Sequence, residues 1–391
     1  MRRTDLAASA AGAFVFSFAL GLASVAMPLL ALQAGYSKPA IGYLTALSAV
    51  SQMGCRLVLG AIMRTFSDWA IVLGAAGLLA ASCLVVAVSP ALVPFALAEL
   101  LQGAARGCFW TGSQTHVVRG PGSSVRRLAT VNLISSIGQL AGPLAAGAIG
   151  ARSFAGHPFG LALLAAGVAA ALGMVPPVLL DRLPPFAKPR GGRNAVWRLP
   201  GVMVGNLAGI TAGTWRAVMN SYVAVALVHA GRTPGEIGVL VSVANGAALG
   251  GSALLTRIGH RRLRLTFALS TLATGLATAA VAAIATSTWA EAGVLAVSGV
   301  GAGVLQALGP AIAADAVAPE QRGDAIAVAG TYRAAALFGA PLAIGASLAA
   351  IPLTAAVLVT GAVIALPAAL VSWVGARRPA VAEPPASYAR D

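Results

Sequence analysis

The sequence predicts an all-α membrane protein with twelve transmembrane helices in two six-helix halves. Three observations predict this fold class: an apolar composition, long uncharged runs separated by basic clusters, and an internal repeat. Of the 391 residues, 58% are hydrophobic and 9% are charged, against roughly 25% charged in soluble domains. The mean hydropathy is +0.85. So few charges cannot cover so much apolar surface in water, which excludes a soluble enzyme, a nucleic-acid-binding module and a disordered chain.

Twelve runs are long enough to cross a membrane, since a hydrocarbon core of about 30 Å needs roughly 20 helical residues. Residues 6–37 contain no charge, which favours an uncleaved first span over a signal peptide. In the last uncharged run, 334–376, the turn falls at Ile351-Pro352. The predicted spans are 8–33, 39–62, 69–89, 91–117, 128–150, 159–180, 199–228, 235–256, 264–287, 290–315, 325–349 and 352–376.

The basic residues orient these spans. With both termini on one side, the loops of that side hold nineteen of the 26 Lys and Arg residues, whereas the other loops hold only Lys38, Arg152 and Arg232. Cytoplasmic loops of membrane proteins are enriched in Lys and Arg. The sequence therefore predicts that both termini are cytoplasmic, in a bacterial inner membrane.

A polar, Pro- and Gly-containing stretch divides the chain. We expect an N-terminal half over 1–180, a cytoplasmic linker over 181–198, a C-terminal half over 199–376 and a cytoplasmic tail over 377–391. The repeat supports this division, because Ile41-Gly42 aligns with Ile237-Gly238 in the corresponding loop of the second half. With six spans in each half, the repeat is parallel about an axis normal to the membrane.

Four segments carry a family resemblance: residues 256–262 between helices eight and nine, 138–147 in helix five, 99–107 in helix four and 317–325 after helix ten. Together they resemble the major facilitator superfamily over nearly the whole chain. The resemblance implies the major facilitator fold, two halves that rock about a central cavity, and transport of a small molecule by a chain that acts as a monomer. It implies neither enzymatic activity nor a cofactor.

In the family, the loop motif places an acid at a helix end, where it pairs with basic residues in one conformation and releases them in another. This sequence keeps the motif only in part. The second copy keeps Arg257 but has Thr256 in place of the acid, and the first copy has Arg64 at the acid position and Asp68 in the basic region. Further gating candidates are Asp315 pairing with Arg322 or Arg333, and Arg56 as a lock between helices. The alternatives are ordinary helix capping and positive-inside anchoring.

The fifth helix contains Gly138, Gly142, Pro143 and Gly147. This pattern resembles the Gly-Pro motif of the superfamily's drug–proton antiporters, in which small residues allow close packing and proline bends the helix. A purely architectural role is the alternative, since Ala340-Pro341 occupies the corresponding place in the repeat.

Ionisable side chains inside the spans are the candidates for the cavity. Glu99 and Arg106 share a helix face about 10 Å apart along the axis, so direct contact is not expected. Glu99 lies near the middle of the bilayer and must face water, pair with a cation or carry a proton. Arg216 is the other cavity candidate, with structural ion pairing as the alternative for all three. Gln102, Asn220 and Gln306 are candidate hydrogen-bond partners of a substrate, or simply of other helices.

Motifs for other energy sources are missing from the sequence. The four histidines have no paired metal spacing, and no Gly-rich segment ends in Gly-Lys-Ser/Thr. We therefore expect no metal or cofactor, and coupling to an ion gradient. The favoured interpretation is proton-coupled efflux of a drug or metabolite. The alternatives are an importer or uniporter of a sugar, amino acid or organic anion, with Arg106 and Arg216 clamping an acidic group, and a transport-dead sensor or assembly protein.

Overall fold

The chain is almost entirely helical in the computed structural model, which describes residues 3–119, 124–185, 196–254, 263–281, 287–317 and 322–375. The first half contains α1 (Arg3–Gln33), α2 (Lys38–Thr65), α3 (Asp68–Val88), α4 (Leu92–Val118), α5 (Ser124–Ile149), α6 (Gly160–Leu172) and α7 (Val175–Val178). After the turn η1 (Val196–Arg198), the second half contains α8 (Pro200–His229), α9 (Pro234–Leu254), α10 (Leu263–Val281), α11 (Thr288–Asp315), α12 (Arg322–Ser347) and α13 (Leu353–Gly375). The predicted fold class is confirmed.

Most predicted spans agree with a helix to within a few residues. The sixth span, predicted over 159–180, corresponds to the candidate membrane span Gly160–Val178, but its helix is interrupted: α6 ends before Gly173 and α7 begins at Val175. Pro176 and Pro177 have no backbone N–H, so an uninterrupted helix would lose two hydrogen bonds there. The proposed tail, 377–391, and the middle of the proposed linker, 186–195, lie outside the described residues.

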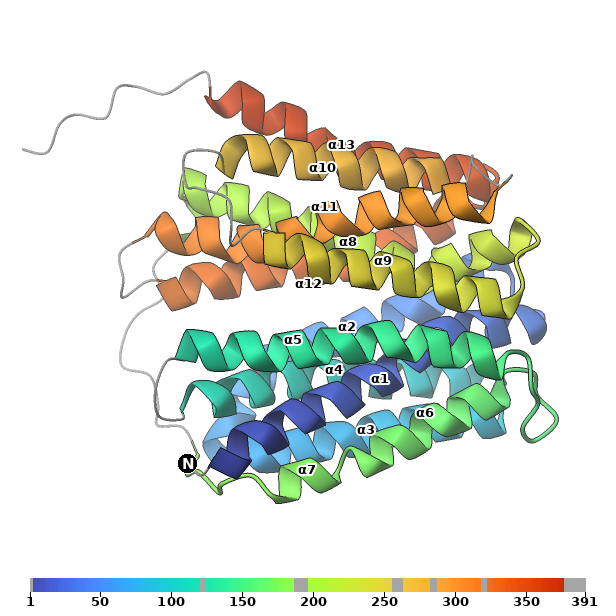
Figure 1. Cartoon of the computed structure of the whole chain (residues 1–391), viewed down its shortest axis with the longest axis horizontal. Coiled ribbons are helices and arrows are strands. Elements are labelled where there is room, and N and C mark those ends of the chain that lie inside the picture. The colour runs from blue at the N-terminus through green and yellow to red at the C-terminus, as the bar shows by residue number, and fades with distance from the viewer. Residues whose placement is uncertain are drawn as a thin grey trace, which may run out of the picture.

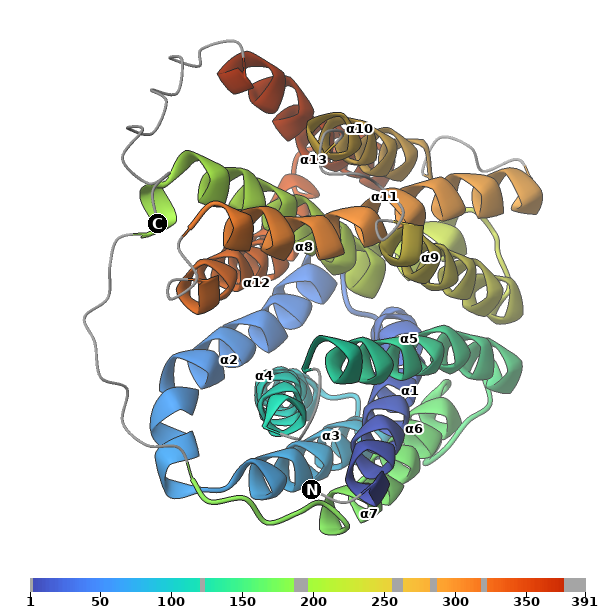
Figure 2. The same cartoon turned by 60° about the vertical axis from the view of Figure 1, so that its left-hand side comes forward.

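The two halves lie one above the other in Figure 1, with α1–α7 below and α8–α13 above. Figure 2 shows α4 nearly end-on within the first half, while α2 and α8 approach each other from opposite halves. We call the end that carries Arg3 and the start of the linker the basic end, and the end that carries the turns after Gln33 and His229 the opposite end.

Six helices in the described part are long and apolar enough to cross a membrane by length and composition alone. α4 and α8 are not among them. These two helices carry Glu99, Arg106, Arg216 and Asn220, and polar groups of this kind inside a membrane face a bundle interior or a water-filled space. We therefore expect α4 and α8 to line the interior of the bundle, and most residues of α8 are buried.

The halves are in close contact toward the opposite end. In α9, a Cβ atom on Gly238 would lie 2.4 Å from the carbonyl oxygen of Pro143 and 2.8 Å from the Cα of Gly147 in α5. At a second contact between the halves, the Tyr222 hydroxyl of α8 donates a hydrogen bond to the carbonyl oxygen of Lys38 at the start of α2, at 3.1 Å. Glycine at these helix crossings allows the backbones to approach closely. The opposite end is thus closed in this conformation.

A buried ion pair joins two helices of the second half at the opposite end. The Arg232 Nε donates to the Glu291 Oε2 at 2.6 Å, and the Glu291 side chain is fully buried. Glu291 lies in the first turn of α11, where the helix dipole also favours negative charge. The pair therefore fixes the turn before α9 against α11.

Removal of this arginine is expected to destabilise the fold. In Arg232→Ala the buried Glu291 carboxylate loses its cation, and breaking such a pair costs about 3–5 kcal/mol. Thermal unfolding of the purified chain in detergent should show a clear loss of stability. Arg152→Ala, a change at an exposed residue of the same end, should leave the unfolding temperature unchanged. An equal, small effect of both substitutions would contradict the stabilising role of the pair.

Candidate functional site

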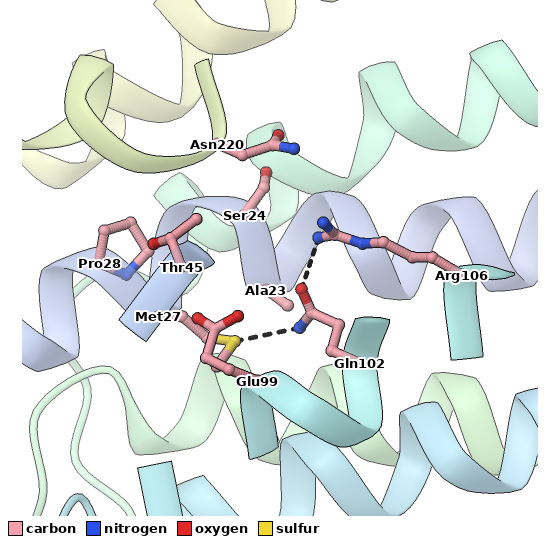
Figure 3. Close-up of a pocket in the computed structure, with 9 residues that line it drawn as sticks. All are labelled: Ala23, Ser24, Met27, Pro28, Thr45, Glu99, Gln102, Arg106 and Asn220. Atoms are coloured by element: carbon pink, nitrogen blue, oxygen red, sulfur yellow. Dashed lines mark hydrogen bonds between the residues drawn. The ribbon is translucent and has the colours of Figure 1, made fainter. Parts of the chain in front are cut away.

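A small pocket lies at the contact between the halves (Figure 3), and two of the helices that line it, α4 and α8, carry predicted cavity residues. Its volume is about 10 Å³, room for about one water molecule. This pocket is therefore too small for a drug-sized ligand. The lining residues come from α1, α2, α4 and α8: Ala23, Ser24, Met27, Pro28, Thr45, Glu99, Gln102, Arg106 and Asn220.

The α4 side of the pocket presents Glu99, Gln102 and Arg106 on one helix face. The Arg106 guanidinium donates to the Gln102 Oε1, and the Gln102 Nε2 donates to the Met27 sulfur at 3.1 Å. Gln102 thus lies between the acid and the base, as Figure 3 shows. Glu99 is 5% exposed, and within the described residues its carboxylate makes neither a hydrogen bond nor an ion pair.

On the α8 side, Asn220 lies across the pocket from α4 (Figure 3). Arg216 is one helical turn from Asn220, on the same face. Its Nη1 donates to the Asn245 Oδ1 at 2.7 Å, and its guanidinium lies 4.9 Å from the centroid of the Trp215 ring. Asn245 in turn donates to the Gln139 carbonyl oxygen of α5, at 3.2 Å. Arg216 is therefore connected to the first half through a neutral amide.

The arginines nearer the basic end have similar surroundings. In α12, the Arg333 Nη2 donates to the Gln306 Oε1 of α11 at 3.3 Å. Gln306 therefore holds an arginine in this conformation, as Gln102 does. Arg56 is exposed, and its Nη1 donates to the Gly330 carbonyl oxygen at 3.5 Å, which joins α2 to α12 across the halves.

The other gating candidates lie away from this contact between α2 and α12. Asp68 is buried at the start of α3 and contacts Arg119 at 3.3 Å, within the first half. Asp315 is exposed at the end of α11. Its expected partner Arg333 donates a hydrogen bond to Gln306 instead. Arg322 begins α12 but its side chain is not described, and Arg257 lies outside the described residues.

The glycines of the fifth helix pack on two different partners. A Cβ atom on Gly138 would lie 2.4 Å from the Phe14 carbonyl oxygen, and one on Gly142 would lie 2.5 Å from that of Phe18, both in α1. Gly147 instead packs on Pro234 and Gly238 of α9, in the other half. Pro143 lies between the two sets, inside α5. The motif therefore supplies close packing both within a half and between halves.

Sequence reasoning missed a buried charge cluster at the basic end, which we call the histidine cluster: Asp5, Asp68, His116, Arg119 and Arg127. The His116 Nε2 lies 3.1 Å from the Asp5 Oδ1, and its Nδ1 lies 3.1 Å from the Asp68 Oδ2 as an ion-pair contact. The Asp181 backbone N–H donates to Asp5 at 2.8 Å. The cluster thus ties α1, α3, α4 and α5 to the start of the linker. The only signal in the sequence was an acid in the first turn of α1 and of α3.

Loss of the histidine is expected to loosen the basic end of the first half. In His116→Ala two buried carboxylates lose the imidazole that lies between them, which costs about 1–3 kcal/mol. Thermal unfolding in detergent should show a lower unfolding temperature than for His229→Ala, an exposed histidine at the end of α8. Equal stability of the two variants would contradict this role.

Comparisons with known proteins give one family and several solved structures that share one fold. The family model described as Major Facilitator Superfamily matches residues 9–228. No curated protein matches the chain by sequence.

Solved transporter structures resemble the whole chain. A bacterial homologue of the human lysosomal transporter Spinster, in an inward-facing and unoccupied conformation, is 11% identical with a TM-score of 0.74, and the match covers 96% of this chain and 98% of that one. The nucleoside transporter NupG is 12% identical with a TM-score of 0.76 and coverages of 94% and 98%. A POT family transporter in complex with a thioalcohol-conjugated peptide is 12% identical with a TM-score of 0.73 and coverages of 95% and 96%.

At these identities the structural likeness shows the fold alone. It agrees with the major facilitator fold that the motifs implied. The family model, in contrast, is a match in sequence over more than half of the chain. The chain therefore belongs to the Major Facilitator Superfamily.

Proposed function

We propose that the chain is a proton-coupled secondary transporter that moves a small molecule by alternating access, with Glu99 as the proton-carrying group. The observation that supports this most is the carboxylate of Glu99, which is buried in the pocket and makes no hydrogen bond or ion pair among the described residues. An ionised carboxylate inside a membrane protein is costly unless it meets water, a cation or a proton. A group that gains and loses a proton during the cycle satisfies this condition.

Coupling requires that the proton binds differently in the two conformations. The pocket meets this requirement because its walls come from both halves: Glu99 lies on α4, and Asn220 lies on α8. Rocking of the halves changes the distance between these walls and therefore the solvation of Glu99. A pocket buried within one half would keep the same surroundings throughout.

The basic end is, in this proposal, the cytoplasmic end, in a bacterial inner membrane, since basic loops remain inside. The close packing at Gly238 and Tyr222 then seals the periplasmic side. The conformation is closed to the periplasm, and the pocket of about 10 Å³ must widen before a substrate enters. A single chain supplies both halves, so the proposed transporter is a monomer.

Two directions of transport are open to this mechanism. Resemblance of the α5 segment to antiporters favours efflux of a drug or metabolite. Uptake of an organic anion is favoured by a different observation: Arg216 and Arg333 have no carboxylate partner within the described ranges. The proton-carrying role of Glu99 is common to both directions.

The test is flux in proteoliposomes under an imposed pH gradient. A pH-sensitive dye inside the vesicles reports proton movement while carboxylates, phosphates, sugars, nucleosides, dipeptides and organic amines are added in turn. At least one solute is expected to move protons in vesicles with protein and not in empty vesicles. Flux without any proton movement would contradict coupling, and no flux with any solute would favour the transport-dead alternative.

A further inference from the structure

We propose that the substrate carries an anionic group, a carboxylate or a phosphate, which Arg106 and Arg216 bind between the halves while Arg333 attracts it from the basic end. This inference rests on the proposed transport function and names its substrate class. It also implies that proton and substrate move in the same direction.

Each of the three arginines is held by a neutral amide side chain rather than by an acid. Arg106 bonds Gln102, Arg216 bonds Asn245 and Arg333 bonds Gln306. An amide oxygen fixes the direction of a guanidinium but cancels none of its charge. A guanidinium has five N–H donors, and one donor of each is used in a hydrogen bond to the residues that the structure describes. The remaining donors are available to a ligand.

The positive charges also act on one another. Arg216 interacts electrostatically with Arg106 and with Arg333, and Arg333 with Arg56. All three arginines are half-buried. Arg106 lines the pocket together with one carboxylate, Glu99, whereas Arg216 and Arg333 lie outside its lining. Placing like charges together inside a membrane protein is unfavourable unless something compensates them. An anionic substrate supplies that compensation, and a cationic one would add to the repulsion.

The arginines come from both halves, which gives the anion a mechanical role. Arg106 belongs to α4 of the first half, whereas Arg216 and Arg333 belong to α8 and α12 of the second. An anion that accepts hydrogen bonds from both sides neutralises the repulsion between the halves. Charge-assisted hydrogen bonds of this type are strong and, with arginine, often bidentate. Substrate binding would therefore favour closure of the halves around the pocket.

The charge of Glu99 sets the sign of the coupling. Among the residues that the structure describes, the charged and titratable groups that face Glu99 are Arg106 on its own helix and Cys83 on α3. The other pocket walls present neutral groups: Ser24 on α1, Thr45 on α2 and Asn220 on α8. Protonation removes the one negative charge near the arginines and should strengthen anion binding. By linkage, the anion then strengthens proton binding equally, which corresponds to symport and not to antiport.

The test is binding to the purified full chain in detergent, measured by the shift of thermal unfolding and by calorimetry. The probes are succinate, glycerol 3-phosphate and a short-chain phosphatidylglycerol, each beside a neutral analogue: succinamide, glycerol and a short-chain phosphatidylcholine. At least one of the two soluble anions is expected to bind, and its neutral analogue is not.

Arg216→Gln should weaken binding about ten- to hundredfold, with partial rescue in Arg216→Lys. Arg152→Gln and Arg264→Gln, both exposed, should bind as the unmodified chain does.

The pH arm separates this inference from the proposed function. The affinity of the unmodified chain for the anion should rise as the pH falls, and Glu99→Gln should bind with the higher affinity at every pH. Binding of neutral analogues or cations alone, no response to either soluble anion, or binding only of the phosphatidylglycerol would overturn the anionic-substrate inference. If anions bind through Arg216 but the pH dependence survives in Glu99→Gln, the proton role of Glu99 fails while the anion site stands.

Discussion

Glutamine in place of Glu99 is expected to abolish proton movement driven by solute, while exchange of solute across the membrane continues. Glutamine keeps the size and hydrogen-bonding capacity of the side chain but cannot take up a proton in the relevant pH range. The halves can then still rock around bound solute, although a pH gradient no longer drives accumulation. The measurement is uphill uptake under a pH gradient beside solute counterflow without one, for the solute selected by the flux screen.

The matched control is Glu236→Gln, a change at a surface carboxylate. Glu236 accepts hydrogen bonds from Thr233 at the start of α9, and a glutamine oxygen can keep that capping interaction. This variant should retain both uphill transport and counterflow. If Glu99→Gln accumulates solute as the unmodified chain does, Glu99 is not the proton carrier.

Valine in place of Gly238 is expected to prevent closure of the opposite end and so to stop the transport cycle. The first added atom would lie 2.4 Å from the Pro143 carbonyl oxygen, so α5 and α9 must separate. Overpacking of this kind costs about 1–3 kcal/mol, which shifts an equilibrium between two conformations about 5- to 150-fold. Because the contact exists only when the opposite end is closed, the open conformation should become the major one.

The measurement is the distance between spin labels at Arg152→Cys and Trp289→Cys, two exposed positions of the opposite end in different halves. The three native cysteines are first replaced by alanine. Gly238→Val should lengthen this distance and lower the flux. Gly250→Val is the control, since a Cβ atom at that glycine of α9 meets nothing within 4 Å. An unchanged distance in Gly238→Val would contradict the proposed seal.

The fold could be predicted from the sequence because its determinants are local. Hydrophobic runs of about 20 residues give spans, and basic clusters give loops, whatever the neighbours are. The break between α6 and α7 could not be predicted from hydropathy. Pro176-Pro177 lies near the end of an apolar run, and one bent helix or two shorter helices would have the same hydropathy there. Which of the two forms is decided by backbone hydrogen bonding, and hydropathy carries no information about it.

The candidate site could be predicted only in part. The depth of Glu99 and its spacing from Arg106 follow from the rise of one helix, and the structure places both in one pocket. The partners of the arginines could not be foreseen, because Gln306 and Arg333 lie on different helices. The histidine cluster is the extreme case: His116 and Asp5 are 111 residues apart, and nothing in either segment indicates the other.

Access to the pocket from each side of the membrane tests the account most directly. Ser24, which lines the pocket on α1, would be changed to cysteine in the chain whose native cysteines are alanine, and a membrane-impermeant thiol reagent applied to one face of oriented vesicles at a time. The account expects modification from both faces, with Gly238→Val increasing the rate from the face of the opposite end and decreasing it from the other. Modification from one face only, or from neither, would show that the space around Glu99 does not alternate between the two sides, and the transport mechanism would be wrong.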